Sequence, residues 1–299
     1  MLNYLFTLHP HFLSKMQVVK YINDLCTILS AKREAGLSIG FVPTMGALHN
    51  GHLSLVEAAG QQTGYVVVSI FVNPTQFNDK ADLDRYPRDL QKDIELLEAT
   101  SCQLVFAPEA NEIYPEPDTR QFNFGTIEQV MEGKFRPGHF NGVAQVVSRL
   151  FDIVQPDKAF FGQKDFQQLA IINEMVRRLN LQVEIVACPI IRESDGLAMS
   201  SRNMLLNVEQ RKNAAHISAT LFEAVNKTGE LTVNELCNWV INRINQNEYL
   251  NTEYFEIVDS VTLQPVTSWD APCSKVGCIA VHCGKIRLID NIEFEVTKD

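Results

Sequence analysis

The stretch Pro43-Thr-Met-Gly-Ala-Leu-His-Asn-Gly-His52 lies between an apolar strand expected over Ser38–Val42 and a helix expected over Leu53–Ala59. In an open parallel sheet, ligands bind at the carboxyl ends of the strands, beside the N-termini of the helices that follow. Such a helix N-terminus offers free N–H groups and a partial positive charge, which suit an anion. Gly46 and Gly51 allow close approach of the backbone. This stretch therefore predicts an α/β fold with an anion site at the turn.

The same alternation of strand and helix patterns continues to about residue 190, as is typical of a parallel sheet covered by helices. Strands are expected over Tyr65–Val72, Leu104–Ala107, Ala159–Phe161 and Val183–Ala187. Helices are expected over Ile22–Ala35, from Pro87 onward, over Val143–Val154 and over Asp165–Leu179. We therefore predict a doubly wound, Rossmann-like parallel sheet.

The pattern changes after Cys188–Pro189. Two capping-box helix starts, Asn207–Gln210 and Thr232–Glu235, precede short strands expected over Tyr254–Val258, Cys278–His282 and Ile286–Ile289. We expect three parts: a loosely held N-terminal extension over residues 1–15, a Rossmann-like domain over 16–190, and a smaller C-terminal α/β lid domain over 191–299.

The charge of the chain limits the class of partner. Its 299 residues include 36 Asp plus Glu against 26 Lys plus Arg, a formal net charge of −10. Phosphate-backbone binding draws on clustered basic residues, and no basic run is longer than Arg177–Arg178, so we expect no nucleic acid partner. A locally positive pocket for a small anion remains compatible with an acidic surface.

Cysteine usage and hydropathy indicate a cytoplasmic protein. The seven cysteines are an odd number without a CxxC pair, which is typical of a reduced compartment. The even spacing of Cys273, Cys278 and Cys283 beside His282 suggests zinc, but we favour structural thiols, since zinc sites usually contain closer pairs. No apolar run approaches the ~20 residues that span a membrane, and residues 1–15 lack the basic start of a signal peptide.

His49 and His52 are three residues apart, so one helical turn points both imidazoles the same way. Two imidazoles at a helix N-terminus can donate to phosphate oxygens and stabilise charge that builds up there. Such a pair also occurs as helix caps, core histidines or metal ligands. The Pro and Gly residues and the strand-to-helix context favour nucleotide binding.

Other polar groups lie at matching strand ends and on loops. In Met199-Ser-Ser-Arg-Asn203, hydroxyls and a guanidinium suit a loop that closes over phosphates, although such tripeptides are common on surfaces. In Gly162–Gln168, Lys164 can neutralise a phosphate and Gln168 faces the same crevice. Arg136 and His139 form a cationic pair on a loop. GxxxxGK[ST] and GxSxG are both absent, so a P-loop enzyme or serine hydrolase has no support.

Amides and acids follow the second strong strand. Asn73 precedes Pro74, so it is either a turn former or a ligand, whereas the amide of Gln76 suits a neutral or hydroxylated substrate. Asp89 and Asp93 begin the next helix. They either complement its dipole or face Mg²⁺ carried with nucleotide phosphates.

The HxGH pattern of His49–His52 with a distant Ser-Ser-Arg loop resembles the HIGH and KMSKS pair of the nucleotidylyl-transferase superfamily. Within it, six ordered blocks look like those of the pantothenate synthetase family: PTMGALHNGH, SIFVNPTQF, DLDRYPRDL, RPGHFNGV, FFGQKDFQQL and IRESDGLAMSSRN. RLIDN at Arg287–Asn291 also fits, so the resemblance covers nearly everything after Met16. It implies a homodimer that joins pantoate to β-alanine through pantoyl adenylate, with release of pyrophosphate and AMP.

The resemblance also implies roles for residues, with His49, His52, Lys164 and Arg202 as catalytic groups and His52 as the assigned proton donor. Its ATP site would comprise Met45, Gly46, Ala47, Leu48, His49, Asn50, Gly51, His52, Gly162, Gln163, Lys164, Asp165, Ile191, Met199, Ser200, Ser201 and Arg202. Pantoate would contact Gln76 and Gln168, and β-alanine would contact Gln76, Asn73, Tyr86, Arg136 and His139. Asp93 is the residue expected on the Mg²⁺ side, although Lys92 stands where some relatives have another acid.

Two other classes of function are weighed against the ligase. An adenylyltransferase of the same superfamily would want a cationic cluster for a phosphate-bearing substrate, whereas the substrate side here carries Gln76 and Gln168. A fragment or relative of a class I aminoacyl-tRNA synthetase would bind tRNA, which the net charge of −10 and the lack of a basic arm disfavour.

Overall fold

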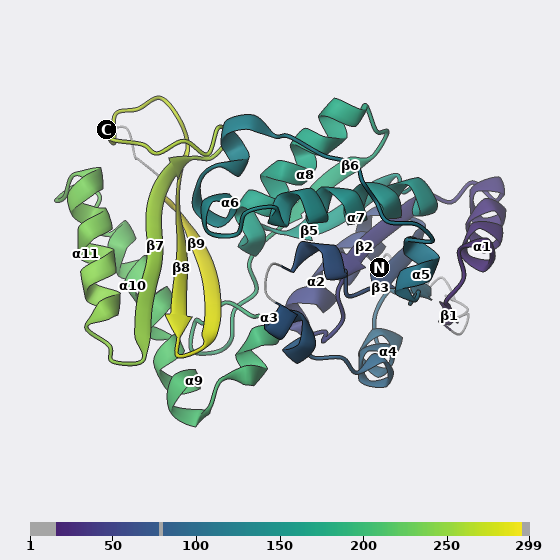
Figure 1. Ribbon diagram of the computed structural model, residues 1–299, viewed down its shortest axis with the longest axis horizontal. Helices are drawn as coiled ribbons and strands as arrows, with labels where there is room; N and C mark the ends of the chain where they lie inside the picture. Colours follow the sequence, from purple (N-terminus) through teal and green to yellow (C-terminus); the bar gives the residue numbers. More distant parts are fainter. Residues whose placement is uncertain (1–15, 78–79, 295–299) are drawn as a thin grey trace, which may run out of the picture.

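The computed structural model describes residues 16–77 and 80–294, so the expected extension over residues 1–15 lies outside the described part. Its main sheet has six parallel strands in the order β1-β4-β3-β2-β5-β6 (Figure 1). The strands are β1 (Gln17–Val19), β2 (Ile39–Thr44), β3 (Tyr65–Ile70), β4 (Leu104–Phe106), β5 (Lys158–Gly162) and β6 (Glu184–Cys188). The direction of winding reverses between β2 and β5, as the doubly wound prediction requires.

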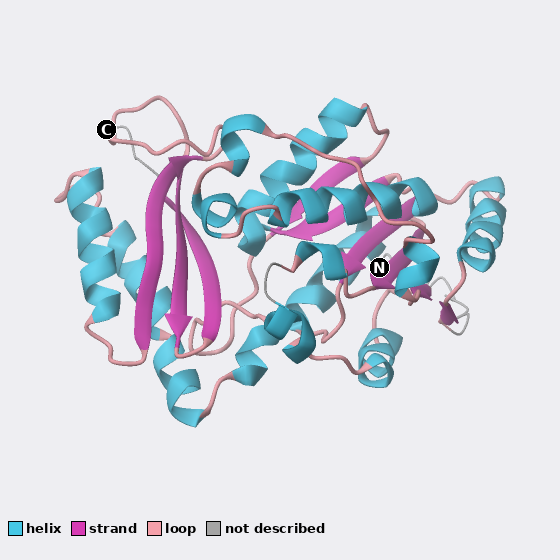
Figure 2. Cartoon of the chain, in the orientation of Figure 1, coloured by secondary structure: helices cyan, strands magenta, loops and turns pink. Residues whose placement is uncertain are grey.

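Alternate side chains of the central strands face opposite sides of this sheet, and both sides are apolar. Phe41 and Val67 join the core under α1 (Ile22–Glu34), α7 (His139–Val154) and α8 (Phe166–Leu179). Val42 and Val66 join the opposite core under α2 (Asn50–Gln62) and α4 (Leu90–Glu98). Figure 2 shows the helices on both sides of the strands. Burial on both faces explains the continuous β-branched run in β3.

The long elements expected from the sequence are present, and several begin or end a few residues away from the expected bounds. The helix expected from Pro87 begins at Leu90, because the Asp89 carboxylate caps it by accepting the N–H of Lys92 at 3.1 Å. Short elements were missed: β1, α3 (Lys80–Arg85), α5 (Ala110–Ile113), α6 (Met131–Phe135), and the 3₁₀ turns η1 (Pro74–Gln76), η2 (Gly125–Glu128), η3 (Gln163–Asp165) and η4 (Ser201–Leu205).

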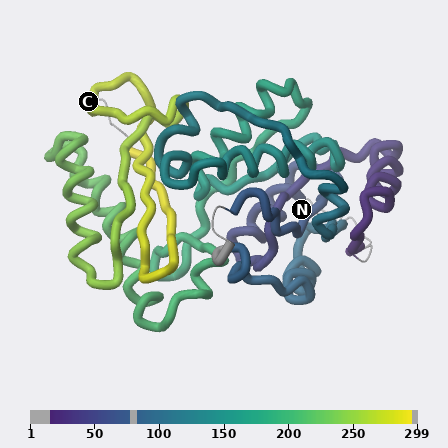
Figure 3. Tube along the Cα trace, viewed as in Figure 1, coloured from purple at the N-terminus to yellow at the C-terminus, as the bar shows by residue number. Residues whose placement is uncertain are grey.

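The C-terminal part contains an antiparallel sheet in the order β7-β8-β9, formed by β7 (Leu250–Asp259), β8 (Lys275–Cys283) and β9 (Ile286–Phe294). Both expected capping boxes are present, at the starts of α9 (Val208–Ala214) and α11 (Val233–Asn245), while α10 (His216–Val225) was missed. One face of the sheet packs on α10 and α11, and the other on α6 and α8. Figure 3 shows the yellow strands between the green helices and the teal segment.

The seven cysteines all lie in the described part of the chain, where each is a free thiol. Cys278 and Cys283 on β8 belong to cores on opposite faces of the small sheet, which agrees with structural thiols and not with a zinc site. Among residues 16–77 and 80–294, no helix is both long enough and apolar enough to cross a bilayer.

Candidate active site

A cavity with about 1240 Å³ of empty space, open to solvent at its mouth, lies at the carboxyl ends of the central strands. Its walls come from β2 and the turn after it, from the segment after β3, from β5 with η3, and from the segment after β6. This is the switch point of the sheet, where the sequence placed the anion site.

Most of the expected site residues line this cavity. The lining includes Met45, His49, Gly51, His52, Asn73, Gln76, Tyr86, Gly162, Lys164, Asp165, Gln168, Ile191, Met199, Ser200, Ser201 and Arg202. The expected residues outside the lining are Gly46, Ala47, Leu48, Asn50, Asp93, Arg136, His139 and Gln163. Residues far apart in sequence are thus brought to one crevice by the parallel topology.

The two histidines cap the helix and line the cavity at the same time. His49 is the N-cap of α2, and its Nδ1 accepts the N–H of Gly51 at 3.1 Å. The Nδ1 of His52 accepts the N–H of His49 at 3.4 Å. Because each Nδ1 is an acceptor, the proton of each neutral ring sits on Nε2. The capping geometry therefore leaves both Nε2–H groups as donors for a cavity ligand.

Burial and neighbouring positive charge keep both rings neutral. Burial, with the charge of Lys164, lowers the pKa of His49 to about 4. Burial, with His49 and then Lys164, also lowers the pKa of His52. At neutral pH both imidazoles donate hydrogen bonds without carrying charge, which supports an electrostatic role for His52 over the implied role of proton donor.

Asp93 does not line the cavity, and the expectation that it lies on a magnesium side stays a prediction. Its Oδ2 accepts the N–H of Ala47 at 3.0 Å and its Oδ1 accepts the N–H of Leu48 at 2.7 Å. The side chain is buried, and burial raises its pKa. Gly46 and Ala47 adopt positive φ of 80° and 50°, which aims the two N–H groups at one anion. The carboxylate thus holds the turn that precedes His49.

The amides after β3 divide into a structural one and a ligand-facing one. Asn73 is fully buried, and its Nδ2 donates to Gln76 Oε1 at 3.3 Å and to the carbonyl of Gly142 at 3.1 Å. Its Oδ1 accepts from Thr75 and from the hydroxyl of Tyr114. Both hydrogens of the Asn73 amide are therefore used within the protein, although the residue lines the cavity, and its contact with β-alanine stays a prediction. Asn73 orients the Gln76 amide in the cavity wall.

The Ser-Ser-Arg segment packs directly on the histidine turn. Ser201 donates its hydroxyl to the carbonyl of Ala47 at 2.9 Å, and Ser200 accepts the N–H of Arg202 at 3.3 Å. The Arg202 guanidinium lies 6.0 Å from the ring centroid of Tyr86. The carbonyl of Ile191 accepts the N–H of Met199 at 3.0 Å, which closes this segment into a loop. Contact between two distant motifs thus assembles one wall of the cavity.

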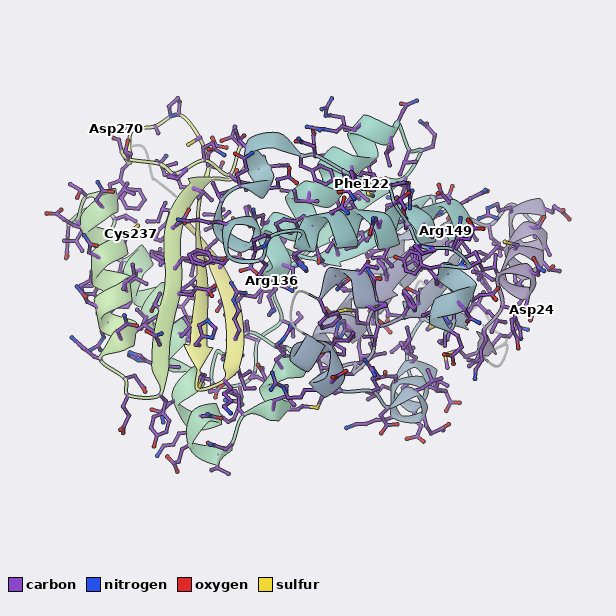
Figure 4. The ribbon with its side chains drawn as sticks, viewed as in Figure 1. Asp24, Phe122, Arg136, Arg149, Cys237 and Asp270 are labelled. Atoms are coloured by element: carbon purple, nitrogen blue, oxygen red, sulfur yellow. The ribbon has the colours of Figure 1, made fainter. Side chains whose placement is uncertain are left out.

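A second, smaller cavity of about 400 Å³ adjoins the first and holds the expected cationic pair. The two cavities share Lys164, Asp165 and Gln168 in their linings. The Arg136 Nη1 lies 3.1 Å from His139 Nε2, and His139 Nδ1 lies 2.8 Å from the carbonyl of Gln76. Figure 4 shows Arg136 between the small sheet and the rest of the chain. Burial, with Arg136, lowers the pKa of His139 to about 4, so this ring is neutral as well.

Glu132 and Tyr254 line the second cavity and are not among the expected site residues. Arg287 pairs with Glu132 at 2.7 Å, and the hydroxyl of Tyr254 donates to Glu132 at 2.8 Å. Although burial alone raises it, Arg287 holds the pKa of Glu132 down at about 2. No local pattern marks these pairs, because each joins α6 to a strand more than a hundred residues away. These interactions connect strands β7 and β9 of the small sheet to Glu132, which also pairs with Arg136.

Residues 17–293 match the family described as pantoate-beta-alanine ligase. The chain belongs to the pantoate-beta-alanine ligase family. The pantothenate synthetase of Bacteroides thetaiotaomicron is 55% identical over 280 residues, which cover 94% of this chain and 99% of that protein. A pantothenate synthetase structure from Thermus thermophilus is 42% identical, with a TM-score of 0.87, over 94% of this chain and 100% of that one.

A pantoate-beta-alanine ligase from Francisella tularensis, solved in complex with beta-gamma ATP and beta-alanine, is 34% identical. Its TM-score is 0.75, over 93% of this chain and 97% of that one. The family resemblance inferred from six sequence blocks is therefore confirmed over the whole length of known pantoate-beta-alanine ligases.

Proposed function

We propose that this chain catalyses the ATP-dependent condensation of (R)-pantoate with β-alanine to pantothenate. A carboxylate oxygen of pantoate attacks the α-phosphorus of ATP and pyrophosphate leaves, which gives pantoyl adenylate. The β-alanine amine then attacks the acyl carbon, and the bond to the AMP oxygen breaks. The observation that carries the proposal is the single cavity that combines the phosphate-suited groups His49, His52 and Lys164 with the two amides of Gln76 and Gln168.

The cavity residues support this chemistry through positioning and charge. A carboxylate is a poor electrophile until its oxygen becomes part of a phosphate leaving group, so the reaction needs alignment and stabilisation of phosphate charge. Neutral Nε2–H donors of His49 and His52, with Lys164 and Arg202, suit the phosphates. The Gln76 and Gln168 amides suit the pantoate hydroxyl and carboxylate. These neutral amides favour an acid substrate over the phosphate-bearing substrate of an adenylyltransferase.

We place β-alanine at the junction of the two cavities. There the side chain of Gln76 faces the main cavity while its backbone contacts His139, and Arg136 offers a cation for the β-alanine carboxylate. Tyr86 lines the main cavity beside Arg202. We further propose a cytoplasmic homodimer in which residues 191–299 act as a lid on residues 16–190.

Magnesium would arrive with the nucleotide. In residues 16–77 and 80–294, no group of three or more His, Cys, Asp or Glu side chains forms a metal site. Asp165 is the carboxylate that lines the cavity in this part of the chain. The site therefore fits Mg²⁺ held mainly by phosphate oxygens, with Asp165 beside it, where the ion would neutralise charge on the departing pyrophosphate.

One assay tests the proposal. AMP formation from ATP is measured with pantoate alone, with β-alanine alone, and with both. We expect sustained AMP release only when both the acid and the amine are present. Release that is independent of either one refutes the ligase, and sustained pyrophosphate release without AMP release, with both the acid and the amine present, would also refute it.

A further inference from the structure

Strand β9 of the small sheet makes contact with two segments that line the main cavity. Asp290 and Asn291 are adjacent on β9, and both side chains are buried. Neither lines the main cavity, although both line the second one, and each contacts a different segment of the main cavity wall. The pair therefore couples two cavity segments that are otherwise distant in the sequence.

Asn291 holds the turn that carries Lys164. Its Nδ2 donates to the carbonyl of Gln163 at 2.9 Å and to the carbonyl of Lys164 at 3.0 Å. These carbonyls lie in the short 3₁₀ turn η3 between β5 and α8. Both hydrogens of the Asn291 amide are thus donated to backbone carbonyls of η3, the turn that contains Lys164. Lys164 lines the main cavity together with His49 and His52, and its charge contributes to the lowered pKa values of both imidazoles.

Asp290 holds Arg192, at the start of the loop that leads to Ser200. Its Oδ2 accepts Arg192 Nη1 at 2.7 Å and its Oδ1 accepts Arg192 Nη2 at 3.0 Å, a two-bond fork. Arg192 follows Ile191 and also donates to the carbonyl of Gly196 at 3.1 Å, inside the loop that leads to Ser200. The N–H of Asn291 donates to Asp290 Oδ1 at 2.8 Å, so the two anchors are themselves joined.

We infer that Asn291 is a positioning residue for phosphate binding, acting through Lys164, so that the small sheet influences the phosphate site without lining the main cavity. A side chain that fixes two consecutive carbonyls of a three-residue turn fixes the direction in which the lysine leaves it. Misplacement of a reacting or binding group by about 1 Å can cost about a hundredfold in rate. The inference rests on the proposed ATP-dependent function.

The test compares Asn291→Ala with a matched control, Gln145→Ala. Gln145 is equally buried and also donates one amide to two carbonyls, those of Asp118 and Arg120, at 3.0 and 2.8 Å. It lies outside both cavities. We expect N291A to lower kcat/KM for ATP at least tenfold, by the positioning argument above, with the KM for pantoate changed less than about twofold. Q145A should lose thermal stability and keep the kinetic constants of the wild type.

A double-mutant cycle separates positioning from general loosening. If Asn291 acts through Lys164, N291A should have less than about a twofold further effect once Lys164→Ala is present. An undiminished effect in K164A, or an N291A enzyme indistinguishable from Q145A, overturns the inference. Should N291A fail to fold, Asn291→Ser is measured by the same criteria. Wild-type protein that forms no AMP from ATP, pantoate and β-alanine refutes the proposed function instead.

Discussion

Replacing Asp93 by Asn tests whether a buried carboxylate holds the histidine turn. The carboxylate accepts the N–H groups of Ala47 and Leu48 at 3.0 and 2.7 Å. Hydrogen bonds to a charged group contribute roughly 1.5–3 kcal/mol each, so two set an upper bound of about 3–6 kcal/mol. An amide of the same shape keeps one acceptor and turns an N–H₂ donor towards the other backbone donor.

The expected loss lies below that bound, because burial raises the pKa of Asp93 and so offsets part of the gain. We expect D93N to lower the free energy of unfolding by about 2–3 kcal/mol, the cost of one broken charge-assisted bond and one unpaired buried donor. Without the anion, the left-handed turn at Gly46 and Ala47 relaxes and moves the capping ring of His49. A shift of about 1 Å there should lower turnover about a hundredfold.

Urea denaturation gives the stability, and AMP release at saturating pantoate and β-alanine gives the turnover. The matched control is Asp89→Asn. Asp89 is the exposed N-cap of the same helix and accepts the N–H of Lys92, and asparagine caps helices equally well. We expect D89N to change stability by less than about 0.5 kcal/mol and turnover not at all. A D93N enzyme with turnover within twofold of D89N would refute this reasoning.

Three further predictions use the same AMP-release and urea-denaturation measurements. His49→Asn keeps an N-cap acceptor but lacks the Nε2–H donor. This variant and His52→Ala should each lower turnover by ~100-fold, with an unchanged circular dichroism spectrum. Wild-type turnover in either variant would mean that its ring does not serve the reaction. Arg202→Ala should raise the ATP concentration needed for half-maximal rate, and an unchanged dependence argues against phosphate binding by that loop. Because the pKa values of His49 and His139 fall from 6.5 to about 4, the unfolded chain binds protons that the native chain excludes; the urea midpoint should therefore decrease as pH drops from 6.5 towards 4, and a constant midpoint contradicts this.

The sequence was sufficient wherever the decisive interaction is local. The capping boxes at Asn207 and Thr232 and the helical spacing of α7 each involve residues within a few positions of one another. The topology of parallel strands then brings the ends of β2, β3 and β5 together, so their loops could be assigned to one site.

The contacts that could not be predicted from the sequence join residues that are distant in the chain. Asp93 sits at a helix start, where an acid complements the dipole, and nothing nearby shows that its carboxylate is bound to Ala47 and Leu48. Asn73 was open between a turn role and a ligand role, and only the carbonyl of Gly142 and the hydroxyl of Tyr114 settle its structural role. The same holds for Asn291, whose two acceptors lie 127 and 128 residues earlier.

The two-sided packing of the small sheet has a consequence for how the chain is made. Strand β8 is buried along nearly its whole length, between α10 and α11 on one side and α6 and α8 on the other. During synthesis the N-terminal part of a protein folds first. In this chain the apolar side chains of Met131 and Phe166 stay uncovered until the last strands have been synthesised. A chain truncated before β9 would therefore expose apolar surface and aggregate, and would not merely be an inactive enzyme.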